Sequence, residues 1–207
     1  MMKKQKKSPI AALLLAVLLL LPAGCGVRGG AADTPPDGAQ QTEGKDQYQT
    51  DPVPDGKPAP VEPDDAAVDT GTRLTCTISI SCATILDNWD KCADSKKPLV
   101  PDDGVLLPAT EVTFSQGESV YDVLQRVCRE NRIHMESSFT PVYNSAYIEG
   151  IGNLYEFDVG SGSGWMYAVN GWYPNYGCSA YTLADGDIIG WAYTCNGYGA
   201  DLGAPMG

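Results

Sequence analysis

The chain has 207 residues, of which 26 are acidic and 14 are basic, so its formal net charge at pH 7 is -12. An acidic chain of this kind repels the phosphate backbone of nucleic acids, and the sequence contains no basic patch with interleaved aromatic residues. Composition and charge therefore exclude the common kinds of nucleic-acid-binding protein.

The amino terminus has the pattern of a secretory signal. Four lysines lie within residues 1–7, and residues 10–21 are apolar without interruption. A charged segment followed by an apolar run of this length is typical of a signal peptide. A membrane-spanning helix would need about 20 apolar residues, so the run is short for a permanent anchor.

The segment Pro22-Ala-Gly-Cys25 follows directly and resembles the lipobox of bacterial lipoproteins, with Pro22 in place of the usual leucine. This resemblance implies that residues 1–24 are removed as a signal peptide and that Cys25 is acylated, for example with palmitate. The protein would then be a lipoprotein held at the outer face of the cell membrane. The alternative is ordinary cleavage near Ala31-Ala32, loss of Cys25 and secretion.

Residues 25–72 have the composition of a spacer. Between Gly26 and Thr72 the chain has ten acidic residues, three basic residues and one aromatic residue, Tyr48. Such a segment cannot bury enough apolar surface to offset the entropy of ordering it. We expect a disordered, Pro/Asp-rich and lipid-anchored spacer, extended by its prolines and its like charges. Recognition by a proline-binding partner is the alternative.

Residues 73–207 are long enough for one domain with one core. Apolar and polar residues alternate over 74–80, which predicts a strand with one buried face, and 110–114 predicts a second strand. Ser119 and Asp122 have the spacing of a capping box, which predicts a helix that ends near Asn131.

The carboxyl-terminal part predicts further strands. Residues 165–169 alternate, Asn170-Gly171 is a preferred two-residue hairpin turn, and Trp172 and Tyr173 would begin the return strand. Residues 188–193 predict a last strand. This order of elements indicates an α+β fold in which one helix packs on a mixed sheet.

Three ordered segments carry a family resemblance: Gln116–Leu124 (QGESVYDVL), Gly164–Gly171 (GWMYAVNG) and Leu183–Ile189 (LADGDII). Together they resemble the transcobalamin C-terminal-like domain, a β-grasp module of exported proteins of Gram-positive bacteria. The resemblance implies a β-grasp fold of the soluble-ligand-binding kind, no enzymatic activity and a cobalamin-like ligand. The related carriers transcobalamin and intrinsic factor also have a large helical domain that encloses the other side of cobalamin. Residues 73–207 contain no such segment, so a second protein is one way of completing the site.

Six cysteines follow Cys25, and an even number in an exported domain predicts three disulfides. We favour a bridge between Cys92 and Cys128, and the order of the other two bridges stays open. Because no Cys-x-x-Cys pair occurs and His134 is the only histidine, we expect no metal site. The cysteines are Cys76, Cys82, Cys92, Cys128, Cys178 and Cys195.

The sequence offers little that indicates catalysis, so we expect no enzymatic activity and no cofactor. Any Ser-His or Cys-His nucleophile must use His134, which has no partner pattern around it. The glycines within 160–164 lead into a strand without a lysine, unlike a phosphate-binding loop. Glu149, Glu156 and Asp158 are read as solvated acids rather than a glycosidase pair.

Aromatic residues mark the best candidate site. Fourteen of the 18 Phe, Trp and Tyr residues lie between Phe139 and Tyr198, and several crowd around the predicted hairpin turn. Rings beside amide groups suit a ligand that is partly apolar and partly hydrogen-bonding, such as a corrin or a sugar. The alternatives are an interaction or adhesion surface for a protein or glycan, and rings that only cover the end of the sheet. The candidate ligand-binding residues are Trp165, Tyr167, Asn170, Trp172, Tyr173, Asn175 and Tyr176.

Overall fold

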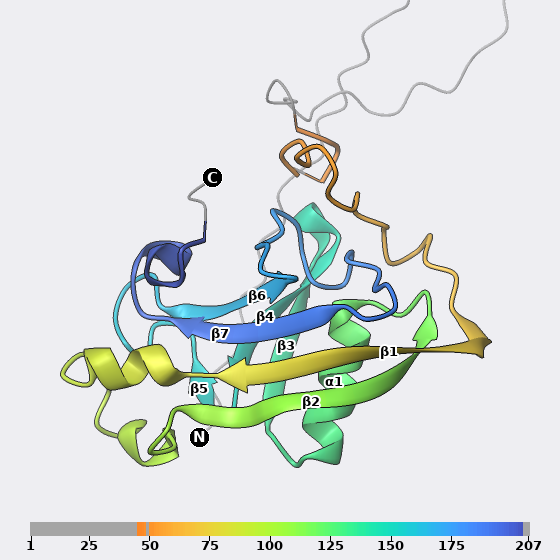
Figure 1. Cartoon of the computed structure of the whole chain (residues 1–207). Coiled ribbons are helices and arrows are strands. Elements are labelled where there is room, and N and C mark those ends of the chain that lie inside the picture. The colour runs from red at the N-terminus through yellow and green to blue at the C-terminus, as the bar shows by residue number, and fades with distance from the viewer. Residues whose placement is uncertain (1–44, 49, 205–207) are drawn as a thin grey trace, which may run out of the picture. The chain divides into compact units, whose positions relative to one another are not determined.

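The computed structural model of the chain describes residues 45–48 and 50–204 (Figure 1). The predicted signal peptide, the predicted lipidation site Cys25 and the first part of the predicted spacer lie outside the described residues. Within the part that is described, no helix is both long enough and apolar enough to cross a membrane.

A four-stranded mixed sheet forms the centre of the domain. Its strands are β1 (Asp69–Ser81), β2 (Val105–Gln116), β6 (Gly164–Val169) and β7 (Ile188–Thr194), in the order β2-β1-β7-β6. The central strands β1 and β7 run parallel, and the two outer pairs are antiparallel. This sheet confirms the strands predicted at 74–80, 110–114, 165–169 and 188–193, although β2 is longer than expected.

The helix α1 (Val120–Glu130) packs its apolar face against this sheet (Figure 1). The predicted capping box is present, because the Ser119 hydroxyl accepts a hydrogen bond from the Asp122 N–H and the Asp122 carboxylate accepts one from the Ser119 N–H. The predicted helix is confirmed, and so is an α+β fold with one packed helix.

A second, three-stranded antiparallel sheet was not expected from the sequence. It consists of β3 (Met135–Thr140), β4 (Ser145–Ile151) and β5 (Leu154–Tyr155), in the order β3-β4-β5. Figure 1 shows α1, β3 and β4 behind the four-stranded sheet. Short 3₁₀ helices occur in the connections: η1 (Ala83–Asn88), η2 (Lys97–Leu99), η3 (Pro141–Tyr143) and η4 (Gly197–Leu202).

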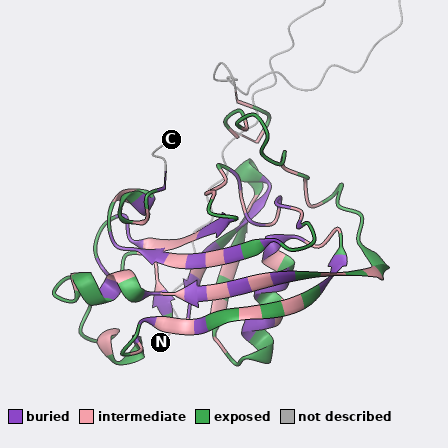
Figure 2. Cartoon of the chain, in the orientation of Figure 1, coloured by how far each residue is buried: buried purple, intermediate pink, exposed green. Residues whose placement is uncertain are grey.

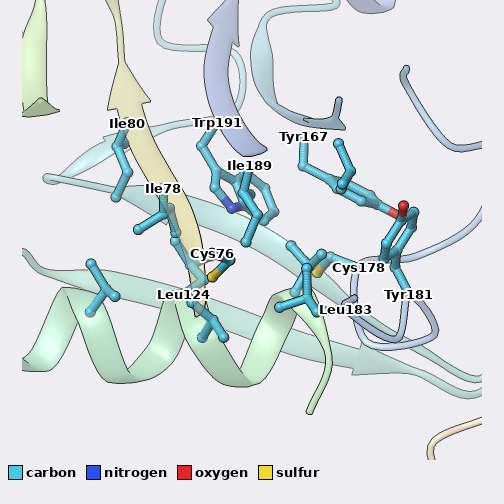
Figure 3. Packing of buried hydrophobic residues seen from close by; sticks show 14 of the residues in the cluster. Cys76, Ile78, Ile80, Leu124, Tyr167, Cys178, Tyr181, Leu183, Ile189 and Trp191 are labelled. Carbon is cyan, nitrogen blue, oxygen red and sulfur yellow. The ribbon is translucent and has the colours of Figure 1, made fainter. Parts of the chain in front are cut away.

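The buried side chains form two hydrophobic clusters. The main cluster lies between the four-stranded sheet, α1 and β4 and includes Ile148 of β4. Figure 3 shows Ile78, Leu124 and Trp191 within it. The second cluster lies at the carboxyl ends of β1 and β7 and includes the fully buried Tyr193. Buried and accessible residues alternate along the central strands (Figure 2), as the period of two in the sequence predicts.

The six cysteines of the domain are buried thiols in this structure, which therefore does not support the predicted disulfides. The favoured pair is separated, because Cys92 lies in the second cluster and Cys128 lies in the main cluster on α1. The thiols instead pack as small apolar side chains, three in each cluster. Cys76, Cys128 and Cys178 belong to the main cluster, and Cys82, Cys92 and Cys195 belong to the second.

The segment predicted to be a free spacer joins the domain before residue 73. Strand β1 begins at Asp69, four residues before the predicted start of the domain. Residues 51–61, which we call the strap, follow the domain surface and connect to it by hydrogen bonds. The composition argument fails for this part of the segment because the contacts come from distant residues that composition does not reveal.

Candidate functional site

The predicted hairpin turn is present but its return strand is not. Asn170 (φ 52°) and Gly171 (φ 76°) both have positive φ, as a type I′ turn requires, and Val169 and Trp172 exchange backbone hydrogen bonds of 2.8 and 3.0 Å. The pairing stops after this one bridge because Pro174 has no N–H to continue a ladder. Strand β6 pairs with β7 instead, so the prediction of a strand at Trp172 and Tyr173 is wrong.

Asn170 has a structural part in this turn. Its side-chain amide donates to Asp187 Oδ1 at 2.8 Å, and its Oδ1 accepts from the Ile188 N–H at 3.0 Å. The amide therefore ties the turn to the start of β7, and both of its polar atoms already have partners.

A group of aromatic side chains lies under the turn, which we call the tip cluster: Trp172, Tyr176 and Tyr181. Their ring centroids are 6.0 to 6.4 Å apart, and the rings of Tyr176 and Tyr181 are stacked at an interplanar angle of 22°. Tyr167 packs beside Tyr181, and its hydroxyl donates to the Tyr176 carbonyl at 2.8 Å. Figure 3 shows Tyr167 and Tyr181 at the edge of the main hydrophobic cluster.

The hydroxyls of these tyrosines stay protonated in neutral solution. Burial raises the pKa of Tyr181 to about 12 and raises the pKa of Tyr167 well above its usual range. Burial, with the nearby Tyr181 as a smaller cause, also raises the pKa of Tyr176. The tip cluster thus presents neutral rings and hydroxyl donors.

The strap covers the tip cluster. The Tyr176 hydroxyl donates to the Pro58 carbonyl at 2.7 Å, and the Asn175 amide donates to the Asp51 carbonyl at 2.8 Å. The Lys57 ammonium lies 5.3 Å from the centre of the Trp172 ring. These three predicted ligand-binding residues therefore contact the chain itself.

The remaining predicted residues lie elsewhere. Trp165 packs edge-on against Tyr193 at 5.3 Å, and its Nε1 donates to the Leu154 carbonyl at 2.8 Å. Tyr173 is half-buried, with its hydroxyl 3.5 Å from the Leu202 carbonyl, and burial raises its pKa. The seven predicted residues do not converge on one site, because β6 places Trp165 at the end opposite to the turn.

Trp165 contributes to an open cavity that the sequence did not indicate. We call it the aromatic pocket, after the four rings that line it: Tyr147, Phe157, Trp165 and Tyr198. Its volume is about 190 Å³, and its lining is mainly apolar. Tyr198 is 76% exposed, Phe157 59% and Tyr147 47%, so three of the rings remain in contact with solvent.

The backbone holds two of these rings in an unusual conformation. Phe157 has φ 68° and Tyr198 has φ 56°, in the left-handed region that bulky residues rarely adopt. The Phe157 N–H donates to Ser163 O at 3.0 Å, and the Tyr198 N–H donates to Gly162 O at 3.3 Å. The glycine-rich 160–164 segment is therefore a support for the two aromatic residues.

Polar groups border the aromatic pocket on one side. The Tyr147 hydroxyl donates to Glu156 Oε2 at 2.5 Å, and burial, assisted by this carboxylate, raises the pKa of Tyr147. Glu156 Oε1 has no hydrogen-bond partner among the described residues. Thr194, which also lines the pocket, shares a hydrogen bond of 2.5 Å with Asp201. The pocket thus combines apolar faces with one available carboxylate oxygen.

The side chains considered for catalysis, among them His134, Glu156 and Asp158, each bind different groups. His134 Nε2 lies 2.9 Å from Glu136 Oε1 and 3.1 Å from the Tyr155 hydroxyl, on an exposed surface. Asp158 accepts from the Tyr155 N–H and lies 3.1 Å from Lys96 Nζ, while Glu156 is bonded to Tyr147. Within residues 45–48 and 50–204, no group of three His, Cys, Asp or Glu side chains could hold a metal ion.

A larger open cavity of about 580 Å³ lies at the amino-terminal end of α1. Its polar side chains include Ser119 and Asp122, which the capping box already uses. Phe139, which is also exposed, lines its outer side. This cavity presents one exposed ring, whereas the aromatic pocket presents three.

No curated protein matches the chain. Among solved structures, haptocorrin in complex with Cbi is similar to 61% of the chain, with 14% identity and a TM-score of 0.42, and the chain spans 26% of that structure. A Ruminococcus gnavus protein, provisionally described as metal-binding, is similar to 59% of the chain, with 16% identity and a TM-score of 0.31, and is covered over 96% of its length. At TM-scores below 0.5, neither likeness bears on the function of this chain.

A match to a domain family covers the helix α1 and the five strands that follow it, β3 to β7. Residues 117–204, from just before α1 to just after η4, are similar to the family described as Domain of unknown function (DUF4430).

Proposed function

We propose that the domain is a non-catalytic binding module and that a small, partly apolar ligand binds in the aromatic pocket. The observation that carries this proposal is the conformation of Phe157 and Tyr198. Both residues have positive φ, yet their rings remain largely exposed. A backbone conformation of this kind costs on the order of 1–3 kcal/mol, and such outliers cluster at functional sites.

The size and chemistry of the pocket limit the ligand. A cavity of about 190 Å³ is smaller than the roughly 300–1,000 Å³ that encloses a whole drug-sized ligand. It suits one ring, such as a sugar, or the edge of a larger ligand such as a corrinoid. The exposed rings would contact the apolar face of the ligand, and Glu156 Oε1 would accept a hydrogen bond from it.

A surface glycan is the second candidate ligand, because the exposed rings of Phe157 and Tyr198 favour a ligand held at the surface. A corrinoid would leave most of its area outside the pocket, so a second protein would be needed to enclose it. Thermal-shift titration of the full chain with corrinoids and with oligosaccharides separates these readings, because a ligand of the folded state raises the melting temperature with concentration.

The substitution Tyr198→Asn tests the pocket itself. Asparagine tolerates positive φ better than tyrosine, so stability should stay the same or rise by up to about 1 kcal/mol. Loss of the ring should weaken binding of the ligand by about 1–3 kcal/mol, as is common for aromatic anchors. Phe139→Ala, in the other cavity, is the matched control and should bind normally. Equal affinity in wild type and Tyr198→Asn would rule out the aromatic pocket.

We also propose that the chain is exported and anchored through a lipid on Cys25. The lysine-rich start, the apolar run and the position of Cys25 support this proposal. A Cys25→Ala protein should leave the membrane fraction and take up no labelled palmitate. Retention in the membrane without label would mean that the uncleaved signal is the anchor.

The absence of catalysis is part of the proposal. His134 supports it, because among the described residues its Nε2 forms hydrogen bonds only with Glu136 and Tyr155, on an exposed surface. His134→Ala should leave ligand binding unchanged. A hydrolytic activity that this substitution abolishes would contradict the non-catalytic reading.

A further inference from the structure

The strap contacts the hairpin tip, which we define as Trp172, Asn175 and Tyr176, through hydrogen bonds and a cation–π contact. Two side chains of the tip, Asn175 and Tyr176, donate to backbone carbonyls of the strap. The Val61 N–H of the strap donates back to the Ala180 carbonyl at 2.9 Å. A cation–π contact between Lys57 and Trp172 lies between these hydrogen bonds.

The composition of the strap matches this mode of contact. It contains four prolines, and the carbonyls that accept hydrogen bonds include those of Pro52 and Pro58. Proline-rich chains are recognised by aromatic surfaces whose donors reach the backbone carbonyls, because their restricted backbone loses little entropy on binding. The tip supplies such a surface with the Trp172 ring, the Tyr176 hydroxyl and the Asn175 amide. The prolines are Pro52, Pro54, Pro58 and Pro60.

The strap is held by few contacts. Most of its side chains are exposed, and Val53 is the strap residue that packs against the main hydrophobic cluster. A β-turn interrupts it, in which the Lys57 N–H donates to Pro54 O at 3.1 Å and Gly56 has φ 77°. Segments with little buried apolar surface open locally without unfolding the rest of the protein. The tip cluster is therefore reachable when the strap opens.

We infer that the hairpin tip is a recognition site for a proline-containing polypeptide segment, and that residues 51–61 of the same chain occupy it. This inference is independent of the aromatic pocket, which lies at the opposite end of β6. The strap competes with any second proline-containing segment for Trp172, Asn175 and Tyr176, and so limits access to the tip.

Hydrogen exchange of the full chain tests the contact in place. Tyr176→Phe keeps the ring and removes the donor to Pro58, so the strap should open more often. Exchange at the Lys57 and Val61 amides should rise about fivefold, which corresponds to the loss of one typical hydrogen bond. Tyr147→Phe, which removes a hydroxyl in the aromatic pocket, should leave these amides unchanged. Equal exchange in all three proteins would overturn the inference.

A peptide titration tests recognition as such. The full chain with a weakened strap (Val53→Ser and Lys57→Ala) is titrated with a labelled synthetic peptide of residues 48–63, and binding is followed by fluorescence anisotropy. We expect saturable binding that is at least tenfold weaker to the wild-type chain, where the intact strap competes. Addition of Asn175→Ala and Tyr176→Phe to the weakened chain should abolish the binding.

A second peptide, in which alanine replaces the four strap prolines, tests whether recognition requires proline. It should bind at least tenfold more weakly than the native peptide. Equal binding of the two peptides would overturn the requirement for proline. Faster exchange in Tyr176→Phe without binding of either peptide would show that the strap is only a structural part of the domain, and would also overturn the inference.

Discussion

Tyr193, near the end of β7, has a buried ring and a hydroxyl with two polar partners. Its side chain is fully buried in the second hydrophobic cluster, where the Trp165 ring packs against it. Its hydroxyl donates to the Tyr155 carbonyl at 2.7 Å and lies 3.1 Å from Ser163 Oγ. Because burial raises its pKa, the hydroxyl remains a neutral donor. One side chain thus connects β7 to β5 and to the loop that supports the aromatic pocket.

Removal of this hydroxyl should be costly. Tyr193→Phe removes the hydroxyl that donates to the Tyr155 carbonyl, which keeps the Asp158 N–H as a donor at 3.3 Å, so the free energy of unfolding should fall by about 0.5–1.5 kcal/mol. Tyr121→Phe is the control, because its half-buried hydroxyl bonds Ser137 and Gln125, which can turn to water. That change should stay within about 0.5 kcal/mol. Urea unfolding measures the free energy of unfolding of both variants. Equal losses of stability in the two would contradict the importance of the buried Tyr193 hydroxyl.

Local signals predicted some residue conformations and not others. The dipeptide Asn170-Gly171 predicts its own turn, because these two residue types favour positive φ. Phe157 and Tyr198 have positive φ against their own preference, so no local pattern reveals them. Their contacts with Ser163 and Gly162 arise only in the folded chain. The aromatic pocket therefore could not be predicted from the sequence, although Trp165, one of its four rings, is among the predicted ligand-binding residues.

Helix α1 is the element that the sequence predicts best. Its first turn has the Ser119 and Asp122 hydrogen bonds of the capping box, and its inner face is fully buried. Both features depend on residues within a few positions of one another, so they can be read without knowledge of the fold.

The capping box should contribute measurably to stability. Ser119→Ala removes the acceptor for the Asp122 N–H and the donor of the 2.7 Å bond to the Asp122 carboxylate. The free energy of unfolding should fall by about 1 kcal/mol, within the range of 0.5–2 found for such caps. Ser138→Ala, at an exposed position of β3, should change it by less than about 0.5 kcal/mol. Chemical denaturation with a helix signal from circular dichroism measures both.

The second sheet, unlike α1, could not be predicted from local sequence patterns. Strand β3 is mostly exposed or half-buried, so it lacks the strict alternation of a half-buried strand. Strand β5 has two residues, too few to show any period. Their pairing with β4 is what defines them, and a pattern search along one segment does not detect pairing.

Contacts between distant residues shape the whole molecule. The Thr75 N–H donates to Asp185 across 110 positions, next to the parallel pairing of β1 with β7. The Tyr176 hydroxyl reaches Pro58 across 118 positions and holds the strap to the tip. Such contacts fix the order of the strands and the path of the strap. Composition alone placed the strap in a disordered spacer because it carries no information on distant partners.

Six buried thiols give the whole molecule a marked dependence on alkaline pH. Burial raises the pKa of Cys76 and Cys82 to about 11 and that of Cys128 and Cys178 to about 12, from an ordinary value of 9.0. Burial also raises the pKa of the two remaining thiols, Cys92 and Cys195. Between these values the folded state keeps protons that the unfolded state has lost. The contribution of these thiols to stability is therefore fully present well below pH 9 and is lost as the pH rises towards 11–12.

At pH 10 each fully buried thiol is expected to lower the free energy of unfolding by about 1.4 kcal/mol. Summed over several thiols, this is a large share of a typical domain's stability. Urea midpoints should therefore fall steeply between pH 8 and pH 10, and the buried tyrosines begin to add to the effect as the pH approaches their ordinary pKa of 10.0. Cys128→Ala removes one titrating group, so its midpoint should depend less steeply on pH even if the small cavity lowers stability at neutral pH. The slope, rather than the absolute stability, is the quantity to compare. A midpoint that stays constant to pH 10 would mean that these cysteines are not buried thiols in solution.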